Sequence, residues 1–363
     1  MSVAQSAKHP TPTYTEYGRR PMNGKPAFLI TIDTEGDNLW VKPRAVTTRN
    51  AEYLPRFQVL CERFGFSPTY LTNWEMVNCE FFREFGGDLV RRATGEIGMH
   101  LHAWDSPPLF SLTSDDPWHQ PYLTEYPLPV VREKIRVITD RLQDVFQCRP
   151  VSHRAGRWAL DENYVRALSE AGYQVDCSVT PHYSWRDCLG APAGSGGSDY
   201  TSFPDKPYFP FVDDIRRPGG STLLEVPVSI LRTSDSAFWG AVRSAGRATT
   251  QTTRLVNRLR PPLLWPYPGI QSMRHLFRLL EVVLLEQRDY FMLVLHSSEL
   301  MPGGSPRFST AASIERLYEV LEALFAEASD TFQGMALCGF YQHWVRPAAP
   351  PPSLQVSVAV RCP

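Results

Sequence analysis

The chain has 363 residues, of which 43% are hydrophobic and 21% are charged, and its formal net charge is −1. These values are typical of a folded globular protein, and they exclude a fibrous or largely disordered chain. A nearly neutral chain also has no overall charge that would attract nucleic acid or an anionic membrane, so we expect a small-molecule or glycan substrate.

Two further features concern location and redox state. Residues 1–25 contain no apolar run of signal-peptide length, and no window reaches the roughly 18 consecutive apolar residues of a membrane-spanning helix. The seven cysteines are scattered and form no Cys-x-x-Cys pair, which argues against a disulfide framework or a zinc ribbon. We therefore expect a cytoplasmic protein without a membrane span, beginning with a flexible segment at residues 1–25.

Apolar, β-branched runs alternate along the chain with segments of helical periodicity. The predicted strands are residues 27–33, 68–72, 96–102, 150–154, 174–179, 223–230 and 291–296. The predicted helices are residues 51–64, 80–93, 130–145, 161–171, 272–286 and 309–327. Gly65 stands where the C-terminal cap of the first helix is expected.

This alternation predicts an α/β fold with a parallel sheet, because parallel strands need the crossover connections that helices supply. Seven or eight such units would form a barrel with its catalytic groups at the C-terminal ends of the strands. Since no repeat or composition shift divides the chain, we expect a single domain at residues 26–346. A Gly-, Ser- and Pro-rich stretch at about 188–220 suggests an insertion that flanks the active site. Residues 347–363 form a Pro-rich tail.

Three carboxylates, Asp33, Glu35 and Asp37, end the first predicted strand within five residues. Asp33 and Glu35 would share one face if the strand continued, and two adjacent carboxylates need a cation or a shared proton. A polar turn after a strand would give the same pattern, because Asp and Gly commonly end strands.

Histidines end two other predicted strands. His100 and His102 are two residues apart, which projects both imidazoles to the same side of a strand. Imidazole and carboxylate ligands suit Zn²⁺ or a related divalent ion. His296 ends the last predicted strand and would reach the same rim, although a solvent-facing histidine at a strand end would look no different.

The fourth and fifth predicted strands carry further charged residues. Arg154 and Arg157 follow the fourth strand, and Asp176 lies inside the fifth. An unpaired buried carboxylate is costly, so we expect an arginine to pair with Asp176.

In this order the stretches resemble the motifs of the polysaccharide deacetylases, carbohydrate esterase family 4, over residues 27 to 300. Thr-Ile-Asp-Thr-Glu-Gly resembles the first motif, Thr-Phe-Asp-Asp-Gly, which implies Asp33 as the catalytic base and Glu35 as a metal ligand. His100 matches the first histidine of the second motif, His-Ser/Thr-x-x-His, whose second histidine falls on Trp104. The second imidazole ligand would then be His102, would be replaced by Asp105, or would be absent.

Three later stretches of the chain resemble the remaining family motifs as well. Arg154-Ala-Gly-Arg157-Trp158 is similar to the arginine loop, in which Arg154 would orient the base. Asp176 would be the aspartate of the fourth motif, with Trp185 as a hydrophobic wall. Leu-Val-Leu-His, ending at His296, resembles the fifth motif.

The resemblance implies a distorted (β/α)7–8 barrel of the NodB-homology type that removes an N-acyl group, foremost acetyl, from an amino sugar or an intermediate of glycan biosynthesis. We expect a divalent metal, Zn²⁺ first and Ni²⁺ or Co²⁺ as alternatives, held by Glu35, His100 and His102. Asp33 would deprotonate water. His296, oriented and kept protonated by Asp176 or a neighbouring carboxylate, would protonate the departing nitrogen.

Aromatic residues beside the motifs could bind the sugar. Trp40, Trp104, Trp158 and Trp185 would stack on sugar faces with Arg157 nearby, whereas core packing is the alternative for any single tryptophan. Two other functions stay open. One is hydrolysis of a cyclic amide or ureide, as in allantoinases, with or without a metal, and the other is glycan binding without catalysis.

Overall fold

The computed structural model describes residues 24–37, 46–233 and 261–345. In these residues the main sheet has eight strands. The strands are β1 (Ala27–Thr34), β2 (Thr69–Thr72), β3 (Glu96–Leu101), β4 (Ser152–Ala155), β5 (Val175–Asp176), β8 (Leu224–Glu225), β11 (Tyr290–His296) and β12 (Gln333–Gly334).

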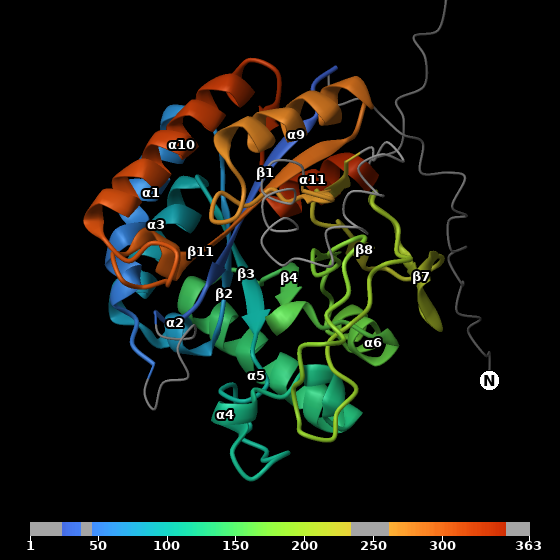
Figure 1. Cartoon of the computed structure of the whole chain (residues 1–363). Helices are drawn as coiled ribbons and strands as arrows, with labels where there is room; N and C mark the ends of the chain where they lie inside the picture. Colours follow the sequence, from blue (N-terminus) through green and yellow to red (C-terminus); the bar gives the residue numbers. More distant parts are fainter. Residues whose placement is uncertain (1–23, 38–45, 234–260, 346–363) are drawn as a thin grey trace, which may run out of the picture.

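Seven of the strands form one continuous path in the order β11-β1-β2-β3-β4-β5-β8, and every pairing along it is parallel. β12 pairs with the first residues of β1. The path curves into an open half-barrel (Figure 1). The prediction of a distorted parallel α/β barrel is therefore confirmed.

Helices connect and cover the strands (Figure 1). They are α1 (Leu54–Arg63), α2 (Trp74–Asn78), α3 (Glu80–Arg92), α4 (Asp116–His119), α5 (Leu128–Phe146), α6 (Glu162–Glu170), α9 (Met273–Leu285), α10 (Ala311–Ser329) and α11 (Leu337–Val345). Gly65 has φ +73° after α1, as expected of a C-terminal glycine cap.

Some elements differ from the prediction. β5 and β8 have only two residues each, much shorter than the predicted strands, and α11 and β12 were not predicted. Two small antiparallel pairs also occur: β6 (Pro210–Phe211) with β7 (Asp214–Pro218), and β9 (Leu231–Arg232) with β10 (Leu263–Leu264). The β6–β7 pair lies inside the predicted insertion, which is otherwise mostly irregular.

The half-barrel does not close by strand pairing in the described residues, because β8 and β11 are its two edges. Single hydrogen bonds instead hold irregular chain against β11. Met292 N donates to Ser229 Oγ at 3.0 Å, and Val294 N donates to Pro266 O at 3.0 Å. Irregular segments at Ser229 and Pro266 thus lie against β11 on its open side, and Pro266 also lines the pocket described below.

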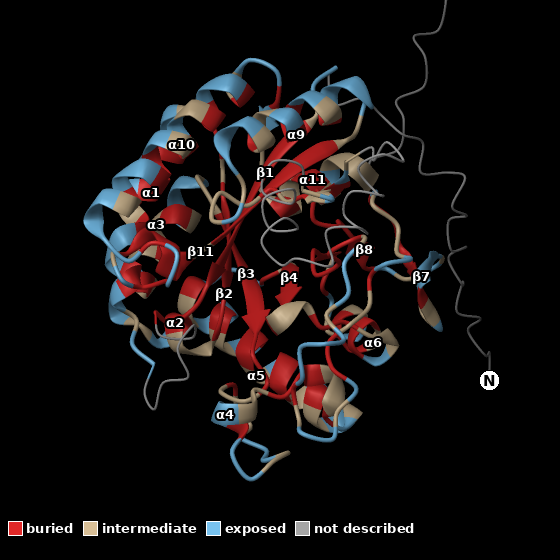
Figure 2. Cartoon of the chain, viewed as in Figure 1, coloured by how far each residue is buried: buried red, intermediate tan, exposed pale blue. Residues whose placement is uncertain are grey.

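β1 lies between the edge strand β11 and β2, and all eight of its residues are buried (Figure 2). Phe28, Ile30 and Ile32 pack in the cluster shared with the covering helices, whereas Ala27 and Leu29 pack in a second cluster inside the barrel. This alternation explains the continuous apolar run of β1, since a parallel strand with both faces covered needs apolar residues on each.

α11 packs one side against the interior of the barrel. Its Leu337 and Phe340 are fully buried in the interior cluster, and Leu337 N donates to Thr69 Oγ1 at 3.0 Å. No helix in the described parts of the chain is long and apolar enough to span a membrane.

The domain boundaries remain a prediction. The expected N-terminal segment, apart from residues 24 and 25, and the expected Pro-rich tail lie outside the described residues.

Candidate active site

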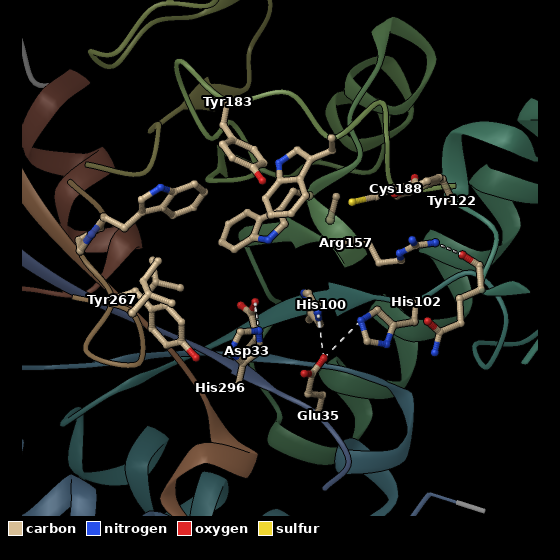
Figure 3. A pocket seen from close by; sticks show the side chains of 18 of the residues that line it. Asp33, Glu35, His100, His102, Tyr122, Arg157, Tyr183, Cys188, Tyr267 and His296 are labelled. Atoms are coloured by element: carbon tan, nitrogen blue, oxygen red, sulfur yellow. Dashed lines mark hydrogen bonds and ion pairs between the residues drawn. The ribbon is translucent and has the colours of Figure 1, made fainter. Parts of the chain in front are cut away.

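Strand register brings the predicted residues together at the C-terminal ends of the strands. Asp33 on β1 is the register partner of His296 on β11, and His100 on β3 is the partner of Arg154 on β4. Because neighbouring strands are only about 4.8 Å apart, Asp33, His100 and His296 from distant parts of the sequence face one pocket (Figure 3), whereas Arg154 is fully buried and does not line it.

Glu35, His100 and His102 form a compact cluster of possible metal ligands. All three are buried, and one ligand atom from each lies within 4.8 Å of the others. Glu35 Oε2 is 3.5 Å from His100 Nε2 and 3.3 Å from His102 Nε2 (Figure 3). Two imidazoles and one carboxylate match a catalytic zinc site with three protein ligands and one open position.

The outer ring nitrogens of both histidines are directed at oxygen atoms. His100 Nδ1 lies 3.0 Å from Arg154 O, and His102 Nδ1 lies 3.6 Å from a carboxylate oxygen of Asp105. Such contacts leave Nε2 available as the ligand and hold the ring in place. Burial opposes a charge on His102, but Asp105 and Glu35 outweigh it and raise its pKa to about 9. A buried pocket that favours positive charge in this way fits a divalent cation.

His102 and Trp104, the two residues nearest the place of the missing second histidine, have different surroundings in the structure. His102 contributes to the cluster, whereas Trp104 stacks on the His102 ring with centroids 4.5 Å apart and an interplanar angle of 18°. Gly156, the residue after β4, also lies against the His102 ring. A Cβ at this position would be only 2.3 Å from His102 Cδ2, so there is no room for a side chain. The His102 ring is therefore confined by Trp104 and Gly156.

Arg154 holds Asp33. Arg154 is fully buried, and its Nη1 donates to Asp33 Oδ1 at 2.7 Å, while Nη2 donates to Thr31 Oγ1 at 2.7 Å. Burial would raise the pKa of Asp33, but Arg154, together with His100 and His296, lowers it to about 2. Asp33 is therefore ionised at neutral pH.

The surroundings of His296 differ in part from the prediction. His296 Nε2 is 3.7 Å from Asp33 Oδ2, and the carboxylate on its other side is Glu299, whose Oε2 is 3.4 Å from Nδ1. Burial lowers the pKa of His296, against the expectation that the imidazole is kept protonated. Of the two alternatives for its partner, the structure favours a neighbouring carboxylate, Glu299, over Asp176.

Asp176 has a histidine partner, so the prediction of an arginine partner is wrong. Asp176 Oδ1 lies 2.5 Å from His153 Nδ1, and His153 Nε2 lies 2.8 Å from Tyr164 OH. Ser178 N and Oγ donate to the same carboxylate. The reason is register, because His153 on β4 is the direct partner of Asp176 on β5. His153 stands beside Arg154 in the sequence, but only the register reveals the pair.

The pocket over these residues has a volume of about 630 Å³. Of the residues expected to bind the substrate, Trp104, Arg157, Trp158 and Trp185 line it, whereas Trp40 lies outside the described residues. Its wall also contains aromatic and basic residues that sequence reasoning missed: Tyr122, Tyr183, Trp265, Tyr267 and Arg307. No spacing pattern marks these residues, because they come from separate loops.

Arg157 has a structural use at the rim. Its guanidinium donates to Gln120 O and, at 2.9 Å, to Leu189 O, and it lies 4.1 Å over the Tyr122 ring. It thereby ties the predicted insertion to the loop after α4. Arg157 and Trp158 have φ of +54° and +62°, a conformation that is uncommon for residues other than glycine and is often found at functional sites.

No known protein-family model matches the chain, and no curated protein matches its sequence. Solved structures do show similar folds. A proposed polysaccharide deacetylase from Mycobacterium smegmatis is 16% identical, with 91% of this chain and 96% of that one covered and a TM-score of 0.48. The 4-alpha-glucanotransferase from Thermococcus litoralis is 12% identical, with 88% of this chain and 40% of that one covered and a TM-score of 0.46. Puue allantoinase is 14% identical, with 88% of this chain and 89% of that one covered and a TM-score of 0.42. Because identities this low leave function open, it must be argued from the site.

Proposed function

We propose that the protein is a metal-dependent hydrolase that removes an N-acyl group, foremost acetyl, from an amino sugar. The observation that carries the proposal is the meeting of three groups in one pocket. These are the cluster of Glu35, His100 and His102, the ionised Asp33, and an imidazole at His296. Amide hydrolysis needs a polarised carbonyl, an activated water and a proton donor for the nitrogen, and each group fits one of these needs.

Glu35, His100 and His102 would hold the metal. When bound there, a divalent ion such as Zn²⁺, Ni²⁺ or Co²⁺ would supply Lewis acidity toward the acyl oxygen and lower the pKa of water. The chain itself supplies the orientation of the ligands, through the Arg154 carbonyl behind His100 and Asp105 behind His102.

Proton transfers fall to Asp33 and His296. Arg154 occupies Asp33 Oδ1, so Oδ2 is the oxygen on the His296 side that would accept the proton of the attacking water. His296 Nε2, 3.7 Å from that oxygen, would then take this proton from Asp33 and pass it to the departing nitrogen as the C–N bond breaks, which returns Asp33 to its ionised form. The products are a carboxylic acid, such as acetate, and a free amine.

The pocket wall favours a sugar over a small polar substrate. Trp104, Trp158, Trp185 and Trp265 all line the pocket, and aromatic rings stack on the apolar faces of sugars. A volume of about 630 Å³ lies within the usual range for pockets that enclose a ligand.

The test is acetate release from N-acetylated sugars and nucleotide sugars, with and without chelator, and with metal analysis of the purified protein. Asp33→Asn should abolish release. Asp37→Asn is the matched control, because Asp37 accepts from Thr47 and lies outside the pocket lining. Release that survives Asp33→Asn would refute the mechanism. Release from cyclic ureides that is insensitive to chelator would favour the allantoinase-like alternative, and ligand binding without any turnover would favour a glycan-binding protein.

A further inference from the structure

The chain turns sharply after β11 in the sequence His-Ser-Ser-Glu, residues 296–299. Ser297–Leu300 form a single 3-10 turn, and all four residues are buried. The turn therefore places a carboxylate, Glu299, beneath the imidazole of His296 without access to solvent.

Both oxygens of Glu299 have defined partners. Oε2 accepts from His296 N at 2.9 Å and is also 3.4 Å from His296 Nδ1. Oε1 accepts from the hydroxyl of Tyr267, a residue of the pocket wall. Since Nδ1 faces Glu299, the other ring nitrogen, Nε2, is the one on the side of Asp33.

The same turn holds a metal-ligand candidate. Ser297 Oγ donates to Glu35 O at 3.0 Å and accepts from Glu35 N at 3.1 Å. Asn50 donates to both Glu35 O and Ser297 Oγ. The segment of residues 296–299 thus contacts both the metal-ligand candidate Glu35 and the imidazole of His296.

We propose that Glu299 is a positioning residue that fixes the His296 imidazole through Nδ1, and that Tyr267 fixes Glu299 in turn. The inference rests on the proposed hydrolase function. Glu299 takes the role for which the sequence offered Asp176, whose oxygens are engaged by His153 and Ser178. The purely structural rival is a capping box and nothing more, in which the Glu299 side chain accepts the backbone N–H of His296 and the His296 side chain accepts the backbone N–H of Glu299.

The charged surroundings of Glu299 are shared with the site. Besides His296, the charged groups that act on it are Arg307, Glu35 and Asp33. Burial raises its pKa to about 8, and Arg307 acts in the opposite direction. A substitution at Glu299 is thus expected to change the electrostatic environment of the imidazole as well as its orientation.

Glu299→Gln separates the two roles. Glutamine is the same size, and its amide oxygen can still accept the His296 N–H, so a capping role survives while the carboxyl group is lost. We expect kcat to fall by about 100-fold, KM to stay within about twofold, and the acidic limb of the pH profile of kcat to move. Glu225→Gln is the matched control, because Glu225 is also a fully buried carboxyl with a raised pKa and lies outside the pocket lining.

A second readout needs no turnover. In protein with labelled histidine, NMR follows the ring nitrogens of His296, assigned with His296→Gln. Glu299→Gln should shift the Nδ1 resonance and the pKa of His296, and Glu225→Gln should not. Unchanged kcat, pH profile and resonances in Glu299→Gln would overturn the inference while leaving the hydrolase proposal intact. Absence of activity in the unaltered protein would instead count against the hydrolase, and the NMR comparison would still decide the role of Glu299.

Discussion

Replacing Gly156 by alanine should damage the proposed metal site without replacing any of its ligands. The added Cβ would lie 2.3 Å from His102 Cδ2 and 2.6 Å from Leu101 O. The carbonyl cannot move away easily, because Leu101 is paired with Ala155 in the sheet. The shortest ordinary contact is 3.4 Å, so the His102 ring must shift by at least 3.4 − 2.3 = 1.1 Å, toward the stacked Trp104.

A shift of this size exceeds what a metal site tolerates, since ligand distances hold within about 0.2 Å. We expect Gly156→Ala to weaken zinc binding by about 10- to 100-fold, as loss of an orienting contact does. The assay is zinc titration against a competing chelator, with circular dichroism to verify folding. The control is Gly87→Ala in α3, where a Cβ has no neighbour within 4 Å. This control should bind zinc normally and gain about 0.5–1 kcal/mol in stability. A folded Gly156→Ala protein with unchanged zinc affinity would refute the reasoning.

Three other outcomes are expected. Arg154→Met should leave the buried charge of Asp33 uncompensated and lower the free energy of unfolding by about 3–5 kcal/mol in urea titrations, and a loss under about 1 kcal/mol would contradict the buried pair. Zinc at about 100 times its Kd should raise the free energy of unfolding by about 2.7 kcal/mol, an increase that His102→Ala should abolish. Burial lowers the pKa of Lys134 from 10.5 to about 8. Between about pH 8 and pH 10.5 the unfolded chain binds more protons at Lys134 than the folded chain does. The free energy of unfolding, relative to that of Lys134→Met, should therefore rise with pH over this range, and a difference that does not change with pH would contradict the burial of the amine.

Much of the fold was predictable from local patterns. The strand at residues 27–33 was found because both its faces are covered, which demands an unbroken apolar run. The helix at residues 51–64 was found by its apolar stripe and by Gly65 after it, although residues 51–53 belong to a 3-10 helix, Arg49–Tyr53, and α1 begins at Leu54. β5 and β8 were overestimated, because a buried apolar run does not reveal how many of its residues find a pairing partner.

The site was predictable only in part. Asp33, His100 and His296 could be identified because each is a polar residue at the end of an apolar strand. Such a residue is expected either in a site at the end of the sheet or in a polar turn. The role of Trp104 as the ring that stacks on His102 was not visible, since its position suggested a missing ligand. Likewise, the sequence analysis assigned no role to Glu299, although its distance of three residues from His296 is one turn of a 3-10 helix.

The sequence by itself determined the alternation of strands and helices and the chemical types at the strand ends, because both depend on neighbours along the chain. Only the tertiary structure decided which of these groups meet. The pairing of Asp176 with His153 instead of an arginine follows from the register of β4 and β5. In the aromatic wall of the pocket, the rings of Tyr183 and Trp265 contact each other although they belong to loops far apart in the sequence. No local sequence pattern predicts that these loops come together. Strand pairing and contacts between loops join residues that are far apart in the sequence. The periodicity of one segment predicts its own secondary structure but not the segment with which it pairs.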